Sequence, residues 1–357
     1  MSNPTDIKQV NIQVVQVPLN KPFTTARHTV TQMSCVQVTI ELVNGLVGHG
    51  SATPNKVVTG DILDNVKTIL ETVLVPKIHG KNLLQWEQLM LTVQHAVAHN
   101  TPAKAAIEIA LYDLRSQIFG VPLVNLLGSS NYQITTDFTI GIDTTPNMIM
   151  DAQTKVKQGF TALKLKIGTH SLSEDLSRVK QISNAIGSNI TLRLDANQAW
   201  STEEALNAVR KLEQLNLPIE FIEQPVLADN LSGLQQVTQA SKIPIMADES
   251  VFSVADAIKL LELHACNYIN IKLMKTGGLN IATQINQLCE QYGVKCMIGC
   301  MIESQISLAA AVAFAASHKN VVFADLDAVY MSAESENPVY FQLNRDTITL
   351  NDHIGLG

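Results

Sequence analysis

The hydrophobic pattern of residues 1 to about 130 predicts a few strands followed by helices. Residues 10–19 and 34–42 are rich in Val, Ile and Thr, which are typical of strands. Asn44-Gly45 lies between two apolar runs and indicates a hairpin, because both residue types tolerate positive φ. Helical segments are expected from about 59 to 120. This part of the chain is therefore predicted to form an α+β domain.

From about residue 132 the pattern changes to short apolar strands that alternate with amphipathic helices. The predicted strands are 134–142, 161–167, 191–194, 219–222, 243–247, 268–273, 295–298 and 321–324. Such a series is typical of an α/β fold, the (β/α)₈ or TIM barrel. An open doubly wound sheet is the alternative, but no Gly-rich phosphate loop follows the first strand. We therefore predict a barrel over residues 131–328 and a C-terminal segment, 329–357, that packs back on the first domain.

Composition and charge narrow the class of protein. Of the 357 residues, 46% are hydrophobic and 16% are charged, which indicates a folded globular chain. The net charge of -7 argues against broad nucleic-acid binding. The sequence has no signal-peptide pattern and no apolar run of about 18 residues, so we expect a cytoplasmic protein without a membrane span. The hydrophobic content also leaves room for a homo-oligomer surface.

The predicted strand 161–167 carries two lysines, Lys164 and Lys166, whose side chains point to the same face of the strand. One interpretation is a solvated edge strand on which lysines prevent aggregation. The other is a functional pair, because side chains at the carboxyl ends of barrel strands converge on one site. The acidic residues farther along the chain favour the second interpretation.

Carboxylates end the next three predicted strands: Asp195, Glu223 and Asp248, each about one βα unit from the next. They are expected to lie at the same height on adjacent strands. Any one of them could instead be a helix N-cap in a βα loop. Three carboxylates around one point repel one another unless a cation lies between them, and oxygen ligands suit Mg²⁺. Together they predict a Mg²⁺ site.

Lys166 on the second strand and Lys272 on the sixth are expected to face each other across the barrel mouth. This arrangement would supply one base for each face of a bound substrate. A nearby cation and the Lys164 ammonium would lower the pKa of Lys166 toward that of a useful base. The cation would also stabilise the charge that builds on a substrate carboxylate when its α-proton leaves.

The combined motifs resemble the enolase superfamily, and within it the muconate-lactonizing-enzyme subgroup, over nearly the whole chain. They are KLK (164–166), LDAN (194–197), IEQP (222–225), ADES (247–250) and NIKLMK (270–275). The resemblance implies a modified TIM-like barrel with an N-terminal capping domain. It also implies that the three acids bind Mg²⁺, that Lys166 and Lys272 are the acid/base pair, and that Lys164 assists the substrate carboxylate or enolate. The reactions of this family begin with removal of a proton α to a carboxylate.

Asp325 and Asp327 after the eighth strand narrow the choice within the family. On an extended strand end they would share a face and hold a cationic group. This DLD resembles the motif with which dipeptide epimerases bind the substrate's free ammonium group. The alternatives for the pair are a loop cap and a partner for a lysine. The leading hypothesis is a Mg²⁺-dependent dipeptide epimerase that inverts the C-terminal residue.

Other functions use the same acids and lysines. The alternative enzymes are an N-acylamino-acid racemase, an o-succinylbenzoate synthase and a muconate-type cycloisomerase. A further alternative is a binding protein that has the barrel but no catalytic activity. In epimerases of L-Ala-Glu, an arginine in the capping-domain loop binds the glutamate side chain. This chain has Arg27 in that loop, but alignment of the motif puts His28 at the position. Both residues are therefore candidate substrate contacts, and specificity for an acidic side chain stays open.

Overall fold

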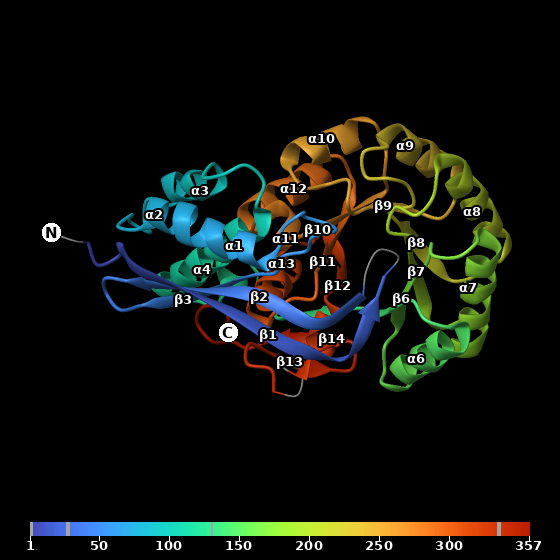
Figure 1. The fold of residues 1–357 in the computed structure, drawn as a ribbon, viewed down its shortest axis with the longest axis horizontal. Coiled ribbons are helices and arrows are strands. Elements are labelled where there is room, and N and C mark those ends of the chain that lie inside the picture. Colours follow the sequence, from blue (N-terminus) through green and yellow to red (C-terminus); the bar gives the residue numbers. More distant parts are fainter. Residues whose placement is uncertain (1–2, 26–28, 130, 334–336) are drawn as a thin grey trace.

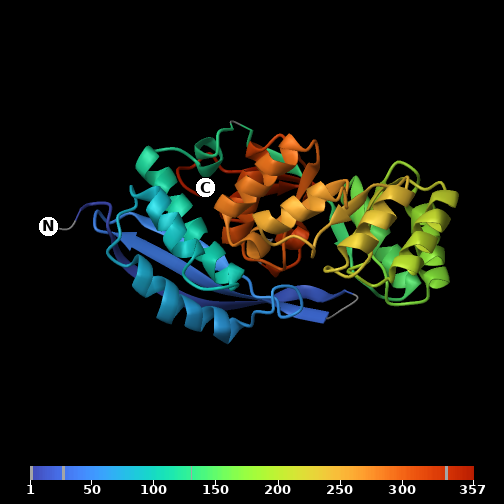
Figure 2. The ribbon, with the colours of Figure 1, turned by 90° about the horizontal axis from the view of Figure 1, so that it is seen from above.

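The computed structural model describes residues 3–25, 29–129, 131–333 and 337–357. The chain begins with an antiparallel sheet of β1 (Ile7–Thr24), β2 (Thr29–Leu42) and β3 (Val47–Ala52). The strands predicted around Asn44-Gly45 are confirmed. Gly45 takes the positive φ of +87° that the turn between β2 and β3 requires. The sheet and its helices form one end of the molecule in Figure 2.

Helices follow this sheet and cover it. In chain order they are α1 (Leu63–Ile69), the π-helix η1 (Leu70–Leu74), α2 (Val75–Ile78), α3 (Trp86–Gln94), α4 (Thr101–Phe119) and α5 (Leu123–Leu126). The long helix α4 packs closely on β3 because Gly48 and Gly50 lack side chains. A Cβ there would lie 2.4 and 1.9 Å from the carbonyl oxygens of Ala110 and Ala106. The two glycines therefore fix the distance between helix and sheet.

The second part of the chain forms an eight-stranded parallel sheet that curls into a barrel, as Figure 1 shows. Its strands, in spatial and sequence order, are β5 (Phe138–Ile140), β6 (Ala162–Lys166), β7 (Thr191–Asp195), β8 (Ile219–Glu223), β9 (Ile245–Ala247), β10 (Tyr268–Lys272), β11 (Lys295–Gly299) and β12 (Val321–Asp325). The predicted α/β barrel with an N-terminal α+β domain is confirmed.

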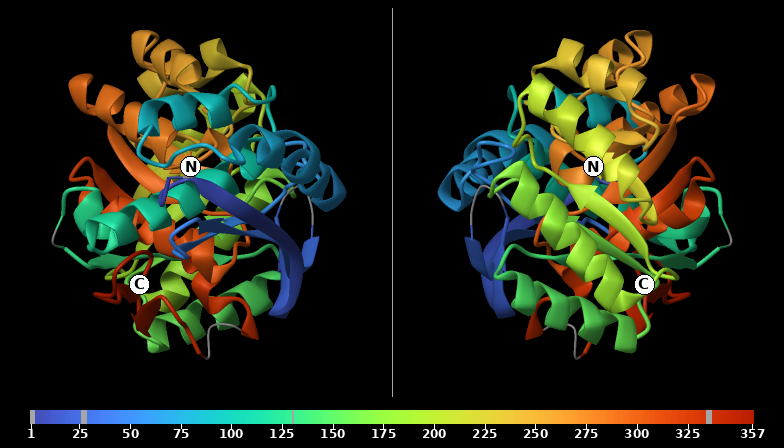
Figure 3. Two further views of the ribbon diagram at one scale, coloured as in Figure 1. Left: turned by 90° about the vertical axis from the view of Figure 1, so that its left-hand side faces the viewer. Right: turned by 90° about the vertical axis from the view of Figure 1, so that its right-hand side faces the viewer.

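Helices connect the strands and cover the outside of the barrel. They are α6 (Thr145–Lys157), α7 (Leu172–Ile186), α8 (Thr202–Gln214), α9 (Leu231–Ala240), α10 (Val254–Glu262), α11 (Leu273–Thr276), α12 (Leu279–Gln291) and α13 (Gln305–Ser317). The right-hand view of Figure 3 shows the yellow-green helices side by side on this surface. No helix in the described ranges combines the length and hydrophobicity that a bilayer span needs.

The first predicted barrel strand, 134–142, is wrong as a single strand. The structure divides it into β4 (Gln133–Thr135) and β5, and β4 instead pairs with β14 (Thr347–Leu350), which pairs with β13 (Phe341–Asn344). The break falls at two buried polar residues. Thr136 Oγ1 accepts a hydrogen bond from the Leu326 amide, and Asp137 pairs with Arg193. These contacts take the chain out of the strand ladder.

The two domains contact each other through α4. The buried Glu108 of α4 accepts a hydrogen bond of 2.9 Å from the amide of Asn280 in α12 of the barrel. Further along α4, Asp113 accepts a hydrogen bond of 3.1 Å from the amide of Leu356 in the C-terminal segment. The domain boundaries drawn from the sequence, including the 329–357 segment, stay predictions.

The seam between β5 and β12 is held by Arg193 of β7. Its Nη1 donates to Asp137 at 2.9 Å and to the carbonyl oxygen of Ala324 at 3.2 Å. Nε donates to Glu220 at 2.8 Å, and the guanidinium lies over the ring of Phe323. This buried arginine therefore joins three sides of the barrel interior.

Replacement of Arg193 by Met is expected to destabilise the protein by about 3–5 kcal/mol, because Asp137 then stays buried without its cation. Urea-induced unfolding measures the change. Arg210→Met on the exposed face of α8 is the control and is expected to change stability by less than about 0.5 kcal/mol. An Arg193→Met protein as stable as the wild type would contradict this account of the seam.

Candidate active site

A cavity of about 380 Å³ lies between the mouth of the barrel and the first domain. The first domain contributes residues of β1, β2 and the segment 53–58. The barrel contributes charged residues at or just after the carboxyl ends of its strands, and these are Lys166, Asp248, Glu249, Lys272, Asp325 and Asp327. The barrel therefore supplies the charged side chains on one side of the cavity, and the first domain forms the other side.

The register of the barrel strands brings the predicted residues together. Lys166 at the end of β6 lies beside Asp195 at the end of β7, which in turn lies beside Glu223 at the end of β8. Asp248 directly follows β9. Asp195, Glu223 and Asp248 are all buried, with exposures of 0%, 0% and 1%. The acids thus share one height of the barrel.

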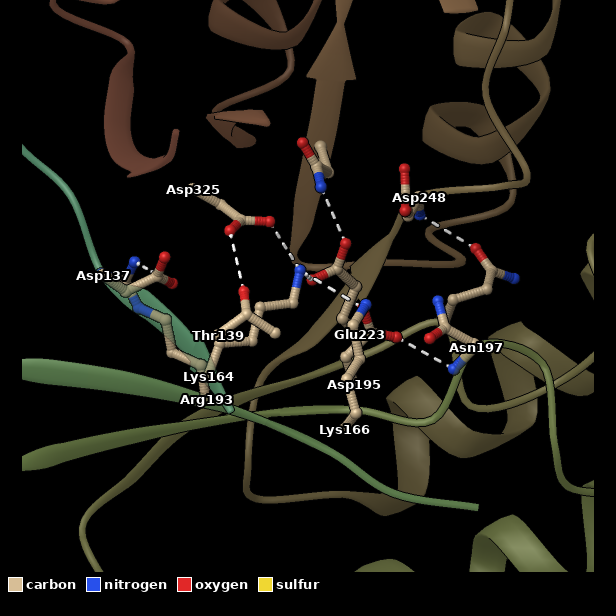
Figure 4. A network of polar contacts seen from close by, with 12 residues as sticks. Asp137, Thr139, Lys164, Lys166, Arg193, Asp195, Asn197, Glu223, Asp248 and Asp325 are labelled. Carbon is tan, nitrogen blue, oxygen red and sulfur yellow. Dashed lines mark hydrogen bonds and ion pairs between the residues drawn. The ribbon is translucent and has the colours of Figure 1, made fainter. Parts of the chain in front are cut away.

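Lys164 lies at the centre of a buried charge network, shown in Figure 4. Its ammonium group lies 2.6 Å from Glu223, 2.8 Å from Asp325 and 3.2 Å from Asp195. The side chain is 1% exposed and β6 lies between β5 and β7, so the edge-strand interpretation is wrong. Burial lowers the pKa of Lys164, but the three carboxylates outweigh it and raise the pKa well above its usual value.

The other two predicted lysines also contact acids. Lys166 Nζ lies 2.5 Å from Asp195, and Lys272 Nζ lies 2.7 Å from Asp248. Burial lowers the pKa of Lys272, but the charges of Asp248 and other nearby carboxylates together have the larger effect, so the net pKa is raised. Both lysines line the cavity, from strands four positions apart in the barrel order. They are therefore placed to approach one molecule from different sides.

The charges on the acids differ because their surroundings differ. Burial raises the pKa of Asp248, but Lys272 and Lys275 outweigh it and the net pKa is low. For Asp195 the attraction of Lys166 and Lys164 likewise exceeds the effect of burial, and its pKa falls. In Glu223 burial prevails over Lys164 and raises the pKa to about 7. Two of the three acids are thus held strongly as carboxylates by lysines.

The carboxylates have the chemistry of a Mg²⁺ site. All three ligands would be oxygen atoms on adjacent strands, which is the donor type that Mg²⁺ prefers. In this arrangement their oxygens contact lysines, and no three His, Cys, Asp or Glu side chains of the described residues converge closely enough to hold a metal ion. Binding would therefore require the carboxylates to turn from the ammonium groups toward a common point.

Asp325 and Asp327 both line the cavity, but the extended geometry predicted for them is wrong. Asp325 ends β12, while Asp327 begins the 3₁₀-helix η2 (Asp327–Tyr330). Asp325 contacts Lys164, and Asp327 accepts a hydrogen bond of 2.6 Å from the amide of Thr139. Burial raises the pKa of Asp325, but Lys164 lowers it to about 2; burial and the Asp325 charge raise the pKa of Asp327 to about 6.

Models of two protein families match most of the chain. The mandelate racemase / muconate lactonizing enzyme N-terminal domain matches residues 8–128, and the enolase C-terminal domain-like family matches residues 147–357. The chain belongs to the mandelate racemase/muconate lactonizing enzyme family. The resemblance drawn from the sequence motifs is confirmed.

Within this family the chain is similar to enzymes that act on dipeptides. It is 41% identical to the L-Ala-D/L-Glu epimerase of Bacillus subtilis, over 98% of this chain and 96% of that protein. It is 42% identical to the hydrophobic dipeptide epimerase of Enterococcus faecalis, over 91% of each. The solved structure of a substrate-liganded complex of the B. subtilis enzyme aligns with a TM-score of 0.96, over 99% of this chain and 98% of that one, at 41% identity.

The family motifs contain further residues of the site that we did not predict. Glu249 follows Asp248 in ADES, lines the cavity and is 7% exposed; its Oε1 accepts a hydrogen bond of 3.2 Å from Asn197. Asn270, in NIKLMK, donates a hydrogen bond of 2.7 Å to Glu223. Both residues could have been predicted from the sequence, because they lie within the ADES and NIKLMK motifs. Arg27 and His28, the predicted substrate contacts, lie outside the described residues.

Proposed function

We propose that this family member is a Mg²⁺-dependent dipeptide epimerase, which inverts the α-carbon of the C-terminal residue. The observation that carries the proposal is the content of one cavity, where Lys166 and Lys272 from distant strands line the same space as Asp248, Asp325 and Asp327. A solved relative, the dipeptide epimerase of Enterococcus faecalis, is a complex with Mg and L-Leu-L-Tyr, at 39% identity and a TM-score of 0.93, over 99% of each chain. The predicted cytoplasmic location stays a prediction.

The three strand-end acids are the proposed Mg²⁺ ligands: Asp195, Glu223 and Asp248. When bound, the ion supplies positive charge next to the substrate carboxylate, which makes removal of the α-proton easier. Lys164, buried among these acids, adds a second positive charge on the same side of the cavity. The charge that develops on the carboxylate oxygens would thereby be stabilised by positive groups that the fold already holds in place.

Lys166 and Lys272 are the proposed bases. One lysine in its neutral form removes the α-proton from one face of the substrate, and the other in its ammonium form returns a proton to the opposite face. In the reverse direction the two exchange roles. A general base contributes about 10²–10⁴-fold to a rate, so both lysines are needed for inversion at a useful speed.

Asp325 and Asp327 are the proposed binding site for the substrate's free ammonium group. Two buried carboxylates at the cavity wall are costly unless a cation pairs with them, and Asp327 has an amide hydrogen bond but no contact with a lysine in the described ion pairs. An N-acylated amino acid or a muconate-type substrate has no ammonium group for this position. The aspartates therefore favour the dipeptide over the racemase and cycloisomerase alternatives.

The test is a substrate screen in D₂O with purified protein. A library of L,L-dipeptides and matched N-acetyl dipeptides is incubated with Mg²⁺, and mass spectrometry detects the gain of one deuteron. We expect exchange in free dipeptides and its loss after treatment with EDTA. Exchange confined to the N-acetyl compounds would contradict the proposal and favour an N-acylamino-acid racemase.

A further inference from the structure

Lys275 is a buried lysine for which the proposed reaction has no role. It lies in α11, the single helical turn that follows β10, and its side chain is 0% exposed. Its ammonium group donates to Oδ1 of Asp248 at 2.6 Å, to the backbone carbonyl oxygen of Asp248, and to the carbonyl oxygen of Asn270 at 3.0 Å. All three donors of the ammonium group therefore have acceptors, and two of these belong to one residue.

These contacts divide the Asp248 carboxylate between two lysines. Oδ1 contacts Lys275 on the buried side, and Oδ2 contacts Lys272, which lines the cavity. The main chain at this residue is also held, because its amide donates to Oε1 of Gln224 at 2.9 Å. Lys275 thus holds the side chain of Asp248, and Gln224 holds its backbone.

The position of Lys275 distinguishes it from the other lysines of the network. Lys164, Lys166 and Lys272 each approach an acid from the barrel interior or the cavity, whereas Lys275 has no exposed surface and does not line the cavity. A buried ammonium group is costly unless its donors are fully paired. Its pairing with a residue that faces the cavity indicates a function in orienting that residue.

We propose that Lys275 is a positioning residue that holds Oδ1 of Asp248, leaves Oδ2 to face the cavity, and thereby sets the affinity for Mg²⁺. The inference rests on the proposed function, in which Asp248 is a metal ligand. Without Lys275, Lys272 is the remaining ammonium group in contact with Asp248 among the described ion pairs. The freed carboxylate would then turn both oxygens toward Lys272 and compete with binding of the ion.

The variant Lys275→Met tests this inference through Mg²⁺ binding measured by isothermal titration calorimetry. We expect the affinity to fall by about 10- to 100-fold, the usual effect of losing a partner that orients a metal ligand. Lys275→Arg keeps the charge and the donors and is expected to recover affinity. The matched control is Lys104→Met, which removes a lysine of 6% exposure from α4 and is expected to bind Mg²⁺ like the wild type.

Thermal unfolding without Mg²⁺ shows whether each variant is folded. If Lys275→Met does not fold, Lys275→Gln, which retains an N–H donor without the charge, is subject to the same expectation. Wild-type affinity in a folded Lys275→Met or Lys275→Gln protein would overturn the inference. Since the readout is Mg²⁺ affinity, a wild-type protein that binds Mg²⁺ but epimerises no dipeptide would contradict the proposed function and leave this inference to be judged by the variants.

Discussion

Replacement of Lys272 by Ala is expected to slow epimerisation by at least about 10³-fold. One of the two epimers should still exchange its α-proton with solvent. The reason is that Lys166 still reaches one face of the substrate, removes the proton there and returns a solvent-derived deuteron to the same face. The other epimer presents its proton to the side that Lys272 served. Proton NMR of each purified epimer in D₂O measures the two exchange rates separately.

The matched experiment is Lys166→Ala, for which the epimer that retains exchange should be the opposite one. Lys259→Ala is the control, because this lysine lies on the surface of α10 with its side chain 62% exposed. It is expected to epimerise like the wild type. Exchange of both epimers at comparable rates in Lys272→Ala would sink the two-base assignment.

The second large effect is expected for Asp327→Asn, which should reduce turnover of free dipeptides by about 10²–10³-fold, because a buried ammonium group loses its charged partner. Asparagine keeps an oxygen that can accept the hydrogen bond from the Thr139 amide, so the local fold should persist. Exchange in an N-acetyl dipeptide should not fall, since that substrate has no ammonium group. Steady-state kinetics on the paired substrates measures the difference.

Asp327 is a sharper target than Asp325 because Asp325 also contacts Lys164 at 2.8 Å. Asp325→Asn is therefore expected to slow both kinds of substrate, through a displaced Lys164 as well as a lost ammonium contact. It serves as the comparison variant. Equal losses on free and N-acetyl dipeptides in Asp327→Asn would show that this aspartate does not recognise the ammonium group.

Much of the barrel could be predicted because buried parallel strands are continuous apolar runs of nearly constant spacing. The same spacing placed Asp195 and Glu223 at the ends of adjacent strands, which the register confirms. The prediction for 134–142 was wrong because Thr136 and Asp137 bind groups far along the chain, the amide of Leu326 and the guanidinium of Arg193. Sequence periodicity carries no information about such contacts.

Parts of the site depend on contacts that only the folded chain creates. Asp325 and Asp327 were expected on an extended strand, but the chain turns into a 3₁₀-helix at Asp327. In the sequence, Lys275 is only one residue of the NIKLMK motif. Its contact with Asp248 forms only when α11 packs against that residue. Residue type and spacing thus predicted which charged residues lie close together at the barrel mouth. The direction of each side chain determines which of them form ion pairs.

Proton NMR of the wild-type protein with L-Ala-L-Glu and a small set of other L,L-dipeptides in D₂O tests the central claim most directly. With Mg²⁺ present, we expect the α-proton signal of the C-terminal residue to disappear while the signals of the L,D diastereomer grow. The N-terminal residue should keep its α-proton. Loss of the C-terminal signal without any diastereomer, or no Mg²⁺-dependent change with any dipeptide, would contradict the assignment as a dipeptide epimerase.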